Sequence, residues 1–286
     1  MTVIASRSFT AEDQAAFAAF SGDHNPRHMD PVAARRTQAG APVVHGVHTL
    51  LWALDQLAAS DVPVTNLATI AVQFSRFVYL NQTVTLTVTR RDERAVTAEL
   101  VRDGLTLATI SLRFGPRTDK DAPPNLLEAP DSIVADPLPN APTMEDIATL
   151  RGWMPPVSTP SAAHAIAPSL IEALGLPRVR GIGLLSRLVG MICPGLHSIF
   201  TGIRVDLVSR TPDRAGVGFS VASWINDSGL PGSTSPETGC SARLPPRCAG
   251  RRSKPRRSRP WQAMSRPGGS WEVRRWSWVD RGAWVP

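Results

Sequence analysis

The stretch GVHTLLWALDQLAA, residues 46–59, decides the fold expected of this 286-residue chain. Its apolar side chains recur three and four positions apart, as they do along one buried face of an α-helix: Val47, Leu50, Leu51, Leu54, Leu57 and Ala58. Trp52 and Ala53 are apolar as well, so the pattern favours a helix that is covered on more than one side. The sequence therefore predicts a long central helix with the rest of its domain packed around it.

The residues after this helix change to a period of two, which is typical of strands with one buried face. Four such segments are expected, at residues 69–77, 84–90, 95–101 and 105–114, and Arg102-Asp-Gly104 joins the last two as a hairpin. A helix followed by an antiparallel meander indicates an α+β fold in which the sheet wraps the helix.

Two shorter helices are expected before the central one. Thr10 has the position of an N-cap, and Gly22 with Pro26 ends that first helix. Asp30 followed by Pro31 predicts a second helix start, leading a short helix towards Gly40. The segment between these helices is therefore a polar loop.

Composition narrows the class of protein. With 42% hydrophobic residues the chain has enough apolar side chains for a real core. No apolar run reaches the roughly 18 to 20 residues that span a bilayer, and the first residues lack a signal core, so we expect no membrane partner and a place in the cytoplasm. Three cysteines, Cys193, Cys240 and Cys248, support neither a disulfide framework nor a zinc site.

The net charge of +7 is concentrated in the C-terminal tail. Residues 231–286 carry 12 Lys and Arg against 3 Asp and Glu, a net +9, so residues 1–230 carry −2. Five of the eight tryptophans, Trp261, Trp271, Trp276, Trp278 and Trp284, lie in this tail. The body of the protein is not basic, which argues against nucleic acid as its partner.

The loop FSGDHNPRHMD, residues 20–30, gathers two carboxylates and two histidines. Together with His45 and His48 these histidines suggest a metal site, but Pro26 keeps His24 and His28 off one regular helix, and we expect no metal. A hydrogen-bonded turn that caps the preceding helix and an acid/base pair remain as alternatives.

A second polar pair, His45-Gly46, opens the most apolar helix of the chain. A helix start that carries glycine exposes backbone N–H groups and the positive end of the helix dipole. Such a site suits the oxyanion that develops when a thioester forms an enolate. A surface turn alone would not need this second pair.

The run FSGDHNPRHMDP, residues 20–31, followed by Ala33 and by VVHG at residues 43–46, resembles the signature of MaoC-like dehydratases, the R-specific enoyl-CoA hydratase group of the hot-dog fold. The resemblance covers about residues 9–116. It implies a long helix wrapped by an antiparallel sheet, and reversible addition of water to a trans-2-enoyl thioester. It implies no cofactor.

Carried over to this chain, the resemblance makes Asp23 and His28 the catalytic pair that holds the water. Asn25 would fix the loop, and the N–H of Gly46 would stabilise the enolate oxygen. His45 would contact substrate or orient the turn, with both roles open. Members of the family often have Pro and Gly-Asp before the strand expected at residues 84–90, where this chain reads FVYLNQ at residues 77–82, so the acyl chain length is open.

The expected reaction is therefore hydration or dehydration of an acyl-CoA or acyl-carrier-protein thioester, as in fatty acid metabolism. A hot-dog thioesterase is the nearest enzyme alternative, although the Asp-x-Asn-Pro-x-His spacing fits water addition better. A non-catalytic subunit that binds or scaffolds acyl thioesters is the alternative from another class.

A second, degenerate hot-dog copy is expected at residues 143–230, after a Pro-rich linker at 117–142 that follows the active-site domain at 1–116. TMEDIA at residues 143–148 is similar to TAEDQA at 10–15. A buried helix at 184–192 and strands at 198–208 and 215–225 follow, so this copy is incomplete next to the first. Hot-dog domains act in pairs, which leaves a homodimer open.

The tail at residues 231–286 reads differently from the rest, because Arg, Pro, Ser and Trp follow one another without an apolar period. No strand or helix face is predicted in it. A shifted reading frame near Asn226 would produce such a change, and ordinary disorder or a nucleic-acid-binding arm are the alternatives.

Overall fold

Helix α4, Gly46–Ala58, is the central helix that the sequence predicts, and it ends one residue earlier than expected. The computed structural model describes residues 1–117, 138–143, 146–147, 150–207, 217–223, 262–263 and 271–277. Every side chain of α4 from residue 47 to residue 55 is buried. The helix is therefore covered on all sides over more than two turns, which confirms the prediction of more than one covered face.

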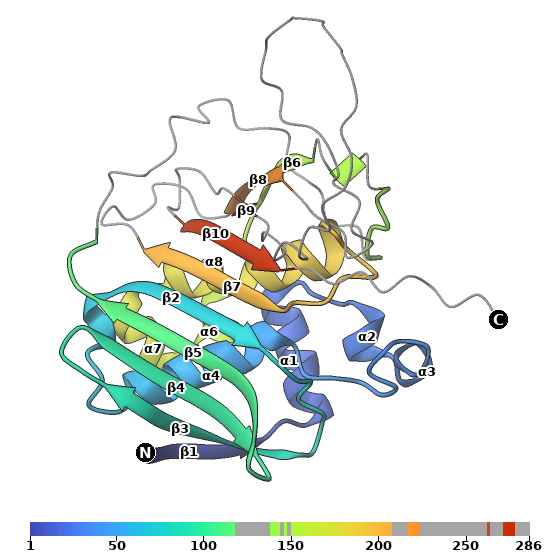
Figure 1. Ribbon diagram of the computed structural model, residues 1–286. Coiled ribbons are helices and arrows are strands. Elements are labelled where there is room, and N and C mark those ends of the chain that lie inside the picture. The colour runs from blue at the N-terminus through green and yellow to red at the C-terminus, as the bar shows by residue number, and fades with distance from the viewer. Residues whose placement is uncertain are drawn as a thin grey trace, which may run out of the picture.

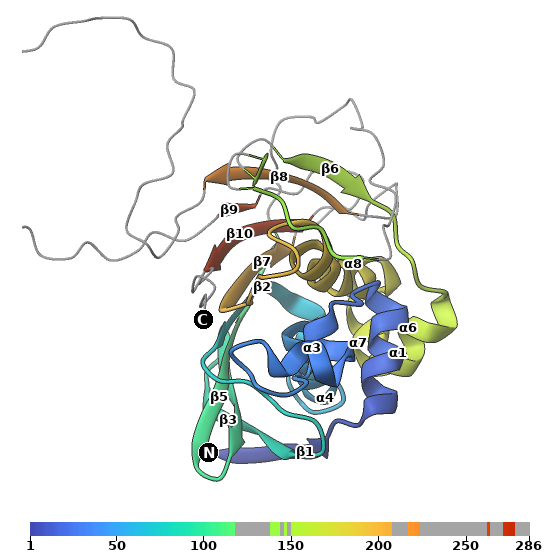
Figure 2. The ribbon, with the colours of Figure 1, turned by 90° about the vertical axis from the view of Figure 1, so that its right-hand side faces the viewer.

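One antiparallel sheet runs across the molecule, and the helices cover one of its faces (Figure 1). Figure 2 shows the strands at one side and the helices at the other. The strand order is β1-β3-β4-β5-β2-β7-β10. The strands are β1 (Thr2–Ser8), β2 (Leu67–Phe74), β3 (Thr83–Arg91), β4 (Ala95–Arg102), β5 (Leu105–Phe114), β7 (Gly202–Leu207) and β10 (Trp271–Ser277).

Strands β2 to β5 confirm the predicted meander, with ends within three residues of the expected ones. In β3, Val84, Leu86 and Val88 are buried and alternate with more exposed residues, as the period of two requires. Strand β1 was not predicted. It lies at the edge of the sheet, pairs only with β3 and leaves Val3 64% exposed, so it carries no alternating signal.

The second half of the chain continues the same sheet. Strand β7 pairs antiparallel with β2, and Thr69 of β2 donates a hydrogen bond of 2.7 Å to Asp206 of β7. Behind β7 lies helix α8, Leu176–Arg187, which runs into a π-helix at Leu188–Ile192. Two central helices under one continuous sheet make this a double hot-dog fold, and α8 confirms the second buried helix, although it begins before residue 184.

The remaining elements complete the second copy. Helices α6 (Pro160–Ile166) and α7 (Pro168–Leu174) precede α8, and strands β6 (Arg151–Met154), β8 (Val217–Ser223) and β9 (Gln262–Ala263) form a separate three-stranded sheet. Strands β7 and β8 confirm the two predicted strands. The residues of TMEDIA that the structure describes include Asp146 and Ile147, which are helical, with Asp146 N–H bonded to Thr143 Oγ1 at 3.2 Å.

The two copies share one hydrophobic core. Buried residues of α4 and of α8 belong to a single cluster of contacts. A hydrogen bond to a buried carboxylate also joins the two copies. Asp55 of α4 accepts it, at 3.0 Å, from the backbone N–H of Leu170 at the start of α7. Removing either copy would therefore expose core surface of the other.

Capping residues determine where the three short helices before α4 begin and end. Helix α1, Ala11–Ser21, begins with a capping box between Thr10 and Asp13 and ends at Gly22, whose φ of 77° favours glycine. Helix α2 (Pro26–Met29) and helix α3 (Pro31–Arg35) follow, and Asp30 caps α3 as predicted. The predicted run towards Gly40 was too long, because α3 ends at Arg35.

Parts of the expected domain plan lie outside the described residues, including most of the Pro-rich linker and the region of Asn226. Strands β9 and β10 lie inside the tail, so the prediction of no strand there was wrong, and β10 pairs with β7 at six residue pairs. Among the described helices, none has both the length and the hydropathy needed to cross a membrane.

His48 of α4 is a buried titratable group that the sequence leaves without a role. Its ring is 1% exposed, stacks on Phe17 at a centroid distance of 4.6 Å and meets Phe9 edge-on at 4.9 Å. Its Nδ1 has no hydrogen-bond partner among the described residues. Burial lowers the pKa of His48 from 6.5 to about 3, so the ring is neutral in the folded protein at neutral pH.

Replacement of His48 by leucine should make the free energy of unfolding fall less steeply as the pH is lowered. The unfolded chain protonates this residue below about pH 6.5 and the folded chain only near pH 3, so it lowers the free energy of unfolding by about 1.4 kcal/mol per pH unit within that window. Urea unfolding at several pH values measures this slope. His24→Gln, at an exposed position, is the matched control and should keep the wild-type slope. An unchanged slope in His48→Leu would contradict the assignment.

Candidate active site

The loop between α1 and α2 turns Asp23 into the interior. After the left-handed residue Gly22, the N–H of Asp23 donates to Ser21 Oγ at 3.1 Å, and the N–H of Asn25 donates to Asp23 Oδ1 at 3.1 Å. These contacts fix the carboxylate in a turn, so a capping turn and an acid/base role for Asp23 do not exclude each other. Asp23 is only 2% exposed.

The second copy completes the surroundings of Asp23. Ser186 Oγ of α8 donates a hydrogen bond of 2.7 Å to Asp23 Oδ2. Gly190 of the π-helix lies so close that a Cβ there would come within 2.5 Å of Asp23 Oδ1. The sequence did not identify either residue as part of the site, although small residues in the apolar run LLSRLVG, 184–190, are a signal of close approach.

Asn25 ties the same loop to the second copy. Its side-chain carbonyl accepts a hydrogen bond of 3.0 Å from the N–H of Arg27 and so caps α2. Its side-chain amide donates to the carbonyl of Gly190 at 2.7 Å. Asn25 therefore connects the loop to the second copy across the boundary between the copies.

His28 presents one ring nitrogen to the site. Its Nδ1 lies 2.7 Å from the carbonyl oxygen of Val43, and a carbonyl can only accept, so Nδ1 carries a proton. Burial lowers the pKa of His28, more strongly than the nearby Asp23 raises it, so the ring is neutral. Its Nε2 is then an acceptor with a free lone pair.

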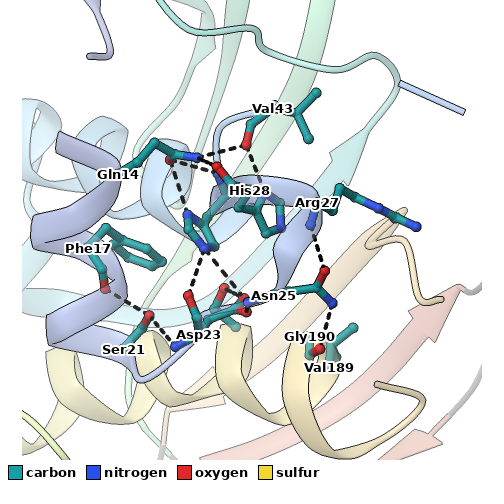
Figure 3. Close-up of polar contacts among 12 residues, drawn as sticks. Gln14, Phe17, Ser21, Asp23, Asn25, Arg27, His28, Val43, Val189 and Gly190 are labelled. Atoms are coloured by element: carbon teal, nitrogen blue, oxygen red, sulfur yellow. Dashed lines mark hydrogen bonds and ion pairs between the residues drawn. The ribbon is translucent and has the colours of Figure 1, made fainter. Parts of the chain in front are cut away.

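Asp23, His28 and His45 lie close together, as Figure 3 shows for Asp23 and His28. One carboxylate oxygen and one nitrogen of each ring all lie within 4.8 Å of one another. A water molecule with two hydrogen bonds of about 2.8 Å bridges groups at such a separation. Burial raises the pKa of the Asp23 carboxyl, which makes its ionised form a stronger base than an exposed carboxylate.

The same three residues are the group of potential metal ligands that the described residues bring together. Their contacts do not fit an ion well, however. His28 Nδ1 faces the Val43 carbonyl, and His45 has an oxygen 3.1 Å from each ring nitrogen. Asp23 Oδ2 accepts from Ser186. With so few free ligand atoms, we assign no metal to this site.

His45 contacts the loop that carries Asp23 but lies outside the cavity. Its side chain is fully buried between Gln14 Oε1, 3.1 Å from Nδ1, and the backbone carbonyl of Asp23, 3.1 Å from Nε2. Burial keeps the pKa of His45 well below its ordinary value, so the neutral ring donates to one of these oxygens. His45 does not line the pocket, so of its two expected roles the geometry favours orientation of the turn.

Gln14 is a site residue that the sequence did not reveal. Its amide donates to the carbonyl oxygens of Val43, at 2.9 Å, and His28, at 3.2 Å, while its oxygen faces His45. It is 2% exposed, on the same buried face of α1 as Phe17. A glutamine on an apolar helix face was the available signal.

Gly46 opens α4 beside this cluster and lines the pocket. As the first residue of the helix, its N–H has no acceptor within the helix, and it stands at the positive end of the helix dipole. Phe74 packs on it, since a Cβ at Gly46 would come within 3.2 Å of the Phe74 ring. The N–H of Gly46 is therefore a candidate oxyanion donor.

A cavity of about 70 Å³ gives access to these groups. Both copies line it, through Asp23, Asn25, Arg27, His28, Val43, Val44, Gly46, Thr49, Phe74, Arg76, Phe77, Val78 and Ala108 from the first and Ser186, Val189, Gly190, Ser198, Ile199 and Phe200 from the second. The structure thus brings Asp23, Asn25, His28 and Gly46 to one cavity and leaves His45 behind it.

Known hydratases resemble this chain over its first copy. A family model described as MaoC like domain matches residues 2–109. An (R)-specific enoyl-CoA hydratase of Aeromonas caviae is 50% identical over 42 residues, which cover 15% of this chain and 31% of the relative. The solved (R)-hydratase of A. caviae involved in PHA biosynthesis is 30% identical over 38% of this chain and 88% of its own, with a TM-score of 0.32.

Across both copies, a conserved protein of Mycobacterium tuberculosis with a double hotdog fold is 14% identical over 76% of this chain and 80% of its own, with a TM-score of 0.49. The fold and the site define a hot-dog protein in which Asp23 and His28 share a cavity with the first residue of the central helix. The chain belongs to the MaoC-like dehydratase family. The aligned segment spans about a third of the curated hydratase.

Replacing Ser186 with alanine tests the contribution of the second copy to Asp23. The Ser186 hydrogen bond lowers the pKa of Asp23, against the larger effect of burial, so its loss should raise that pKa further. If Asp23 must be ionised, the acid limb of the kcat/KM profile should move to higher pH, with about a 10-fold loss on that limb. The profile is measured with an enoyl thioester.

Ser198→Ala is the matched control for Ser186→Ala. Ser198 also lines the cavity, but its hydroxyl donates to the carbonyls of Val189 and Gly195 and not to Asp23. The acid limb should stay in place in this variant. A limb that moves equally in both variants would contradict a specific effect of Ser186 on Asp23.

Proposed function

We propose that the protein catalyses reversible hydration of trans-2-enoyl thioesters to 3-hydroxyacyl thioesters. The observation that carries this proposal is the pair formed by Asp23 and His28, because a carboxylate oxygen and a ring nitrogen lie within 4.8 Å of each other, a distance that one water molecule bridges. The family of this chain also supports the proposal, because an (R)-specific enoyl-CoA hydratase is among the proteins that it resembles.

In this mechanism the two acceptors hold the two hydrogens of the water. Asp23 already accepts one hydrogen bond on each oxygen, from Asn25 and from Ser186, and keeps a lone pair for the water. With both hydrogens engaged, a lone pair of the water oxygen faces C3 of the substrate. Asp23 removes one proton as the oxygen attacks, and His28 Nε2 holds the water, takes that proton from Asp23 and passes it to C2, so that both side chains return to their starting state.

The N–H of Gly46 stabilises the negative charge that develops on the thioester oxygen during this attack. The new C–O bond forms at C3, the double bond shifts to give an enolate, and protonation at C2 restores the carbonyl. Water is the only co-reactant, so the residues of this chain suffice for the reaction. In the reverse direction the same groups remove the C2 proton and release water.

We take coenzyme A as the carrier, because the named activity of the A. caviae relative is that of an enoyl-CoA hydratase. The same name indicates the (R)-3-hydroxyacyl product. An acyl carrier protein would present the same thioester, and fatty acid metabolism is the setting in which either would occur.

The test is to incubate the full chain with crotonyl-CoA and longer trans-2-enoyl-CoAs, following the conjugated-enone absorbance and free thiol together. Loss of absorbance without thiol release is the expected result. Thiol release would instead identify a thioesterase. Folded protein that changes neither signal at any chain length would overturn the proposal and favour a binding subunit.

A further inference from the structure

Arg27 is a charged residue of the active-site cavity to which the proposed mechanism gives no task. It lies in α2, directly before His28, at the second variable position of the spacing Asp-x-Asn-Pro-x-His. It lines the same cavity of about 70 Å³ as Asp23, His28 and Gly46. That spacing fixes no residue type at position 27, so water addition itself does not require an arginine there.

The guanidinium group of Arg27 is anchored but has no carboxylate partner in the described part of the chain. Its Nη1 donates a hydrogen bond to the backbone carbonyl of Ser198 in the second copy. Its Nε–H is buried and has no hydrogen-bond partner among the described residues. The ion pairs of these residues do not include Arg27, and Figure 3 shows its side chain extending away from Asp23. A partly buried cation of this kind favours an anionic ligand.

The charges around the cavity favour an anion over a neutral ligand as well. Of the described residues that line it, Arg27 and Arg76 bring positive charge, and Asp23 brings negative charge when it is ionised. His28 adds no charge, because burial lowers its pKa and leaves the ring neutral. Two guanidinium groups therefore share the cavity with one carboxylate. A second carboxylate, carried by the ligand, would balance them.

The position of Arg27 indicates which part of a thioester would carry this anionic group. Burial lowers the pKa of Arg27, and the charge of Asp23 opposes that effect. Arg27 therefore lies close enough to the proposed base to interact with its charge. In a coenzyme A thioester, the long pantetheine arm keeps the phosphates of the carrier away from the reacting carbons. A carboxylate on a short acyl group, by contrast, lies only a few bonds from C3.

We propose that Arg27 binds a carboxylate on the acyl group, so that this protein prefers short acyl thioesters that carry a second acidic group. The inference rests on the proposed function for the enoyl thioester as substrate, and it adds the class of acyl group. The carboxylate takes no part in the reaction. Water still adds its oxygen at C3 and a proton at C2, and the acidic group stays unchanged.

The first experiment measures the binding of saturated thioesters and needs no catalysis. Pentanoyl-CoA and glutaryl-CoA differ only in a terminal methyl group that a carboxylate replaces, and butanoyl-CoA and succinyl-CoA form the same pair one carbon shorter. Both pairs are titrated into the full chain by calorimetry. In at least one pair the acidic thioester should bind about 10-fold more tightly or better. Equal or weaker binding of the acidic thioester in both pairs would overturn the proposal.

The second experiment assigns this preference to Arg27. Arg27→Met keeps an unbranched side chain without the charge and should abolish the preference for the acidic thioester. Arg27→Gln, which can still donate to the Ser198 carbonyl, takes its place if the methionine variant does not fold, as thermal melting shows. Arg35→Met removes an exposed guanidinium that does not line the cavity, so this control should keep the wild-type preference.

A contact of Arg27 with the carrier, or a purely structural role, predicts a different result in these variants. Both members of each pair would then bind more weakly by the same factor, and their ratio would stay at the wild-type value. An unchanged ratio in a folded Arg27 variant would therefore overturn the role of Arg27.

Turnover separates this inference from the proposed function. trans-2-Pentenoyl-CoA and glutaconyl-CoA are compared as substrates, and hydration with a higher kcat/KM for glutaconyl-CoA is the expected result. Hydration of trans-2-pentenoyl-CoA without any preference in binding would support the proposed function and overturn the inference. Preferential binding of the acidic thioesters without hydration of either substrate would refute the proposed function and leave the assignment of Arg27 standing.

Discussion

Asp23→Asn should lower the turnover of an enoyl thioester by about 10²-fold or more without loss of folding. The amide keeps the shape of the carboxylate and can keep its contacts, because Asn25 N–H still finds an oxygen and the Ser186 hydroxyl can rotate to accept from the new NH₂. What disappears is the negative charge that takes the proton of the water.

The stability of Asp23→Asn should move in the opposite direction. Burial raises the pKa of Asp23, so the folded state holds a proton there more readily than the unfolded state, and stability from this residue falls as pH rises through that pKa. At neutral pH the neutral amide avoids this loss. The variant should therefore melt no lower than wild type, a combination that separates a catalytic role from a structural one.

His28→Ala should also lower turnover by about 10²-fold or more, because the water loses the second of its two acceptors. His24→Ala is the control from the same loop, with an exposed side chain that does not line the cavity, and should keep turnover within about two-fold. Thermal melting verifies folding in each variant. Near-wild-type turnover in Asp23→Asn or His28→Ala would remove that residue from the mechanism.

The parts of this structure that could be predicted are those with a local signal. Helix α4 follows from its apolar spacing, and α1 follows from a capping box and a terminal glycine. Asp23 and His28 were predicted because both lie in one short loop with a specific spacing. Edge strand β1 could not be predicted in this way, since it buries too few side chains to show a period.

The contacts that complete the site have no local signal. Ser186 bonds Asp23 across 163 residues of sequence, and Gly190 approaches the same carboxylate from the neighbouring turn. A serine and a glycine in an apolar helix are each common for other reasons, so only the packing of α8 against the loop gives them a role. For His45 the sequence left substrate contact and orientation of the turn both open, and its burial favours orientation of the turn.

Gly190→Ala should be as damaging to turnover as a change in the catalytic pair, about 10²-fold, although it adds a single methyl group. The new Cβ would come within 2.5 Å of Asp23 Oδ1 and 2.6 Å of Oδ2, so the carboxylate must move. Misplacement of a reacting group by about 1 Å is enough for a loss of this size. Turnover with crotonyl-CoA measures the effect.

Gly183→Ala is the matched control on the same helix. Its Cβ would come within 2.4 Å of the Phe20 ring, which lies in the core and not in the cavity, so it should lower the melting temperature while folded molecules keep their turnover. In a double-mutant cycle, Gly190→Ala should destabilise the wild type more than it destabilises Asp23→Ala, because truncation of Asp23 removes the carboxylate that the methyl group strikes. Wild-type turnover in Gly190→Ala, or additive stabilities in the cycle, would contradict the proposal that the second copy holds the Asp23 carboxylate in a catalytic position.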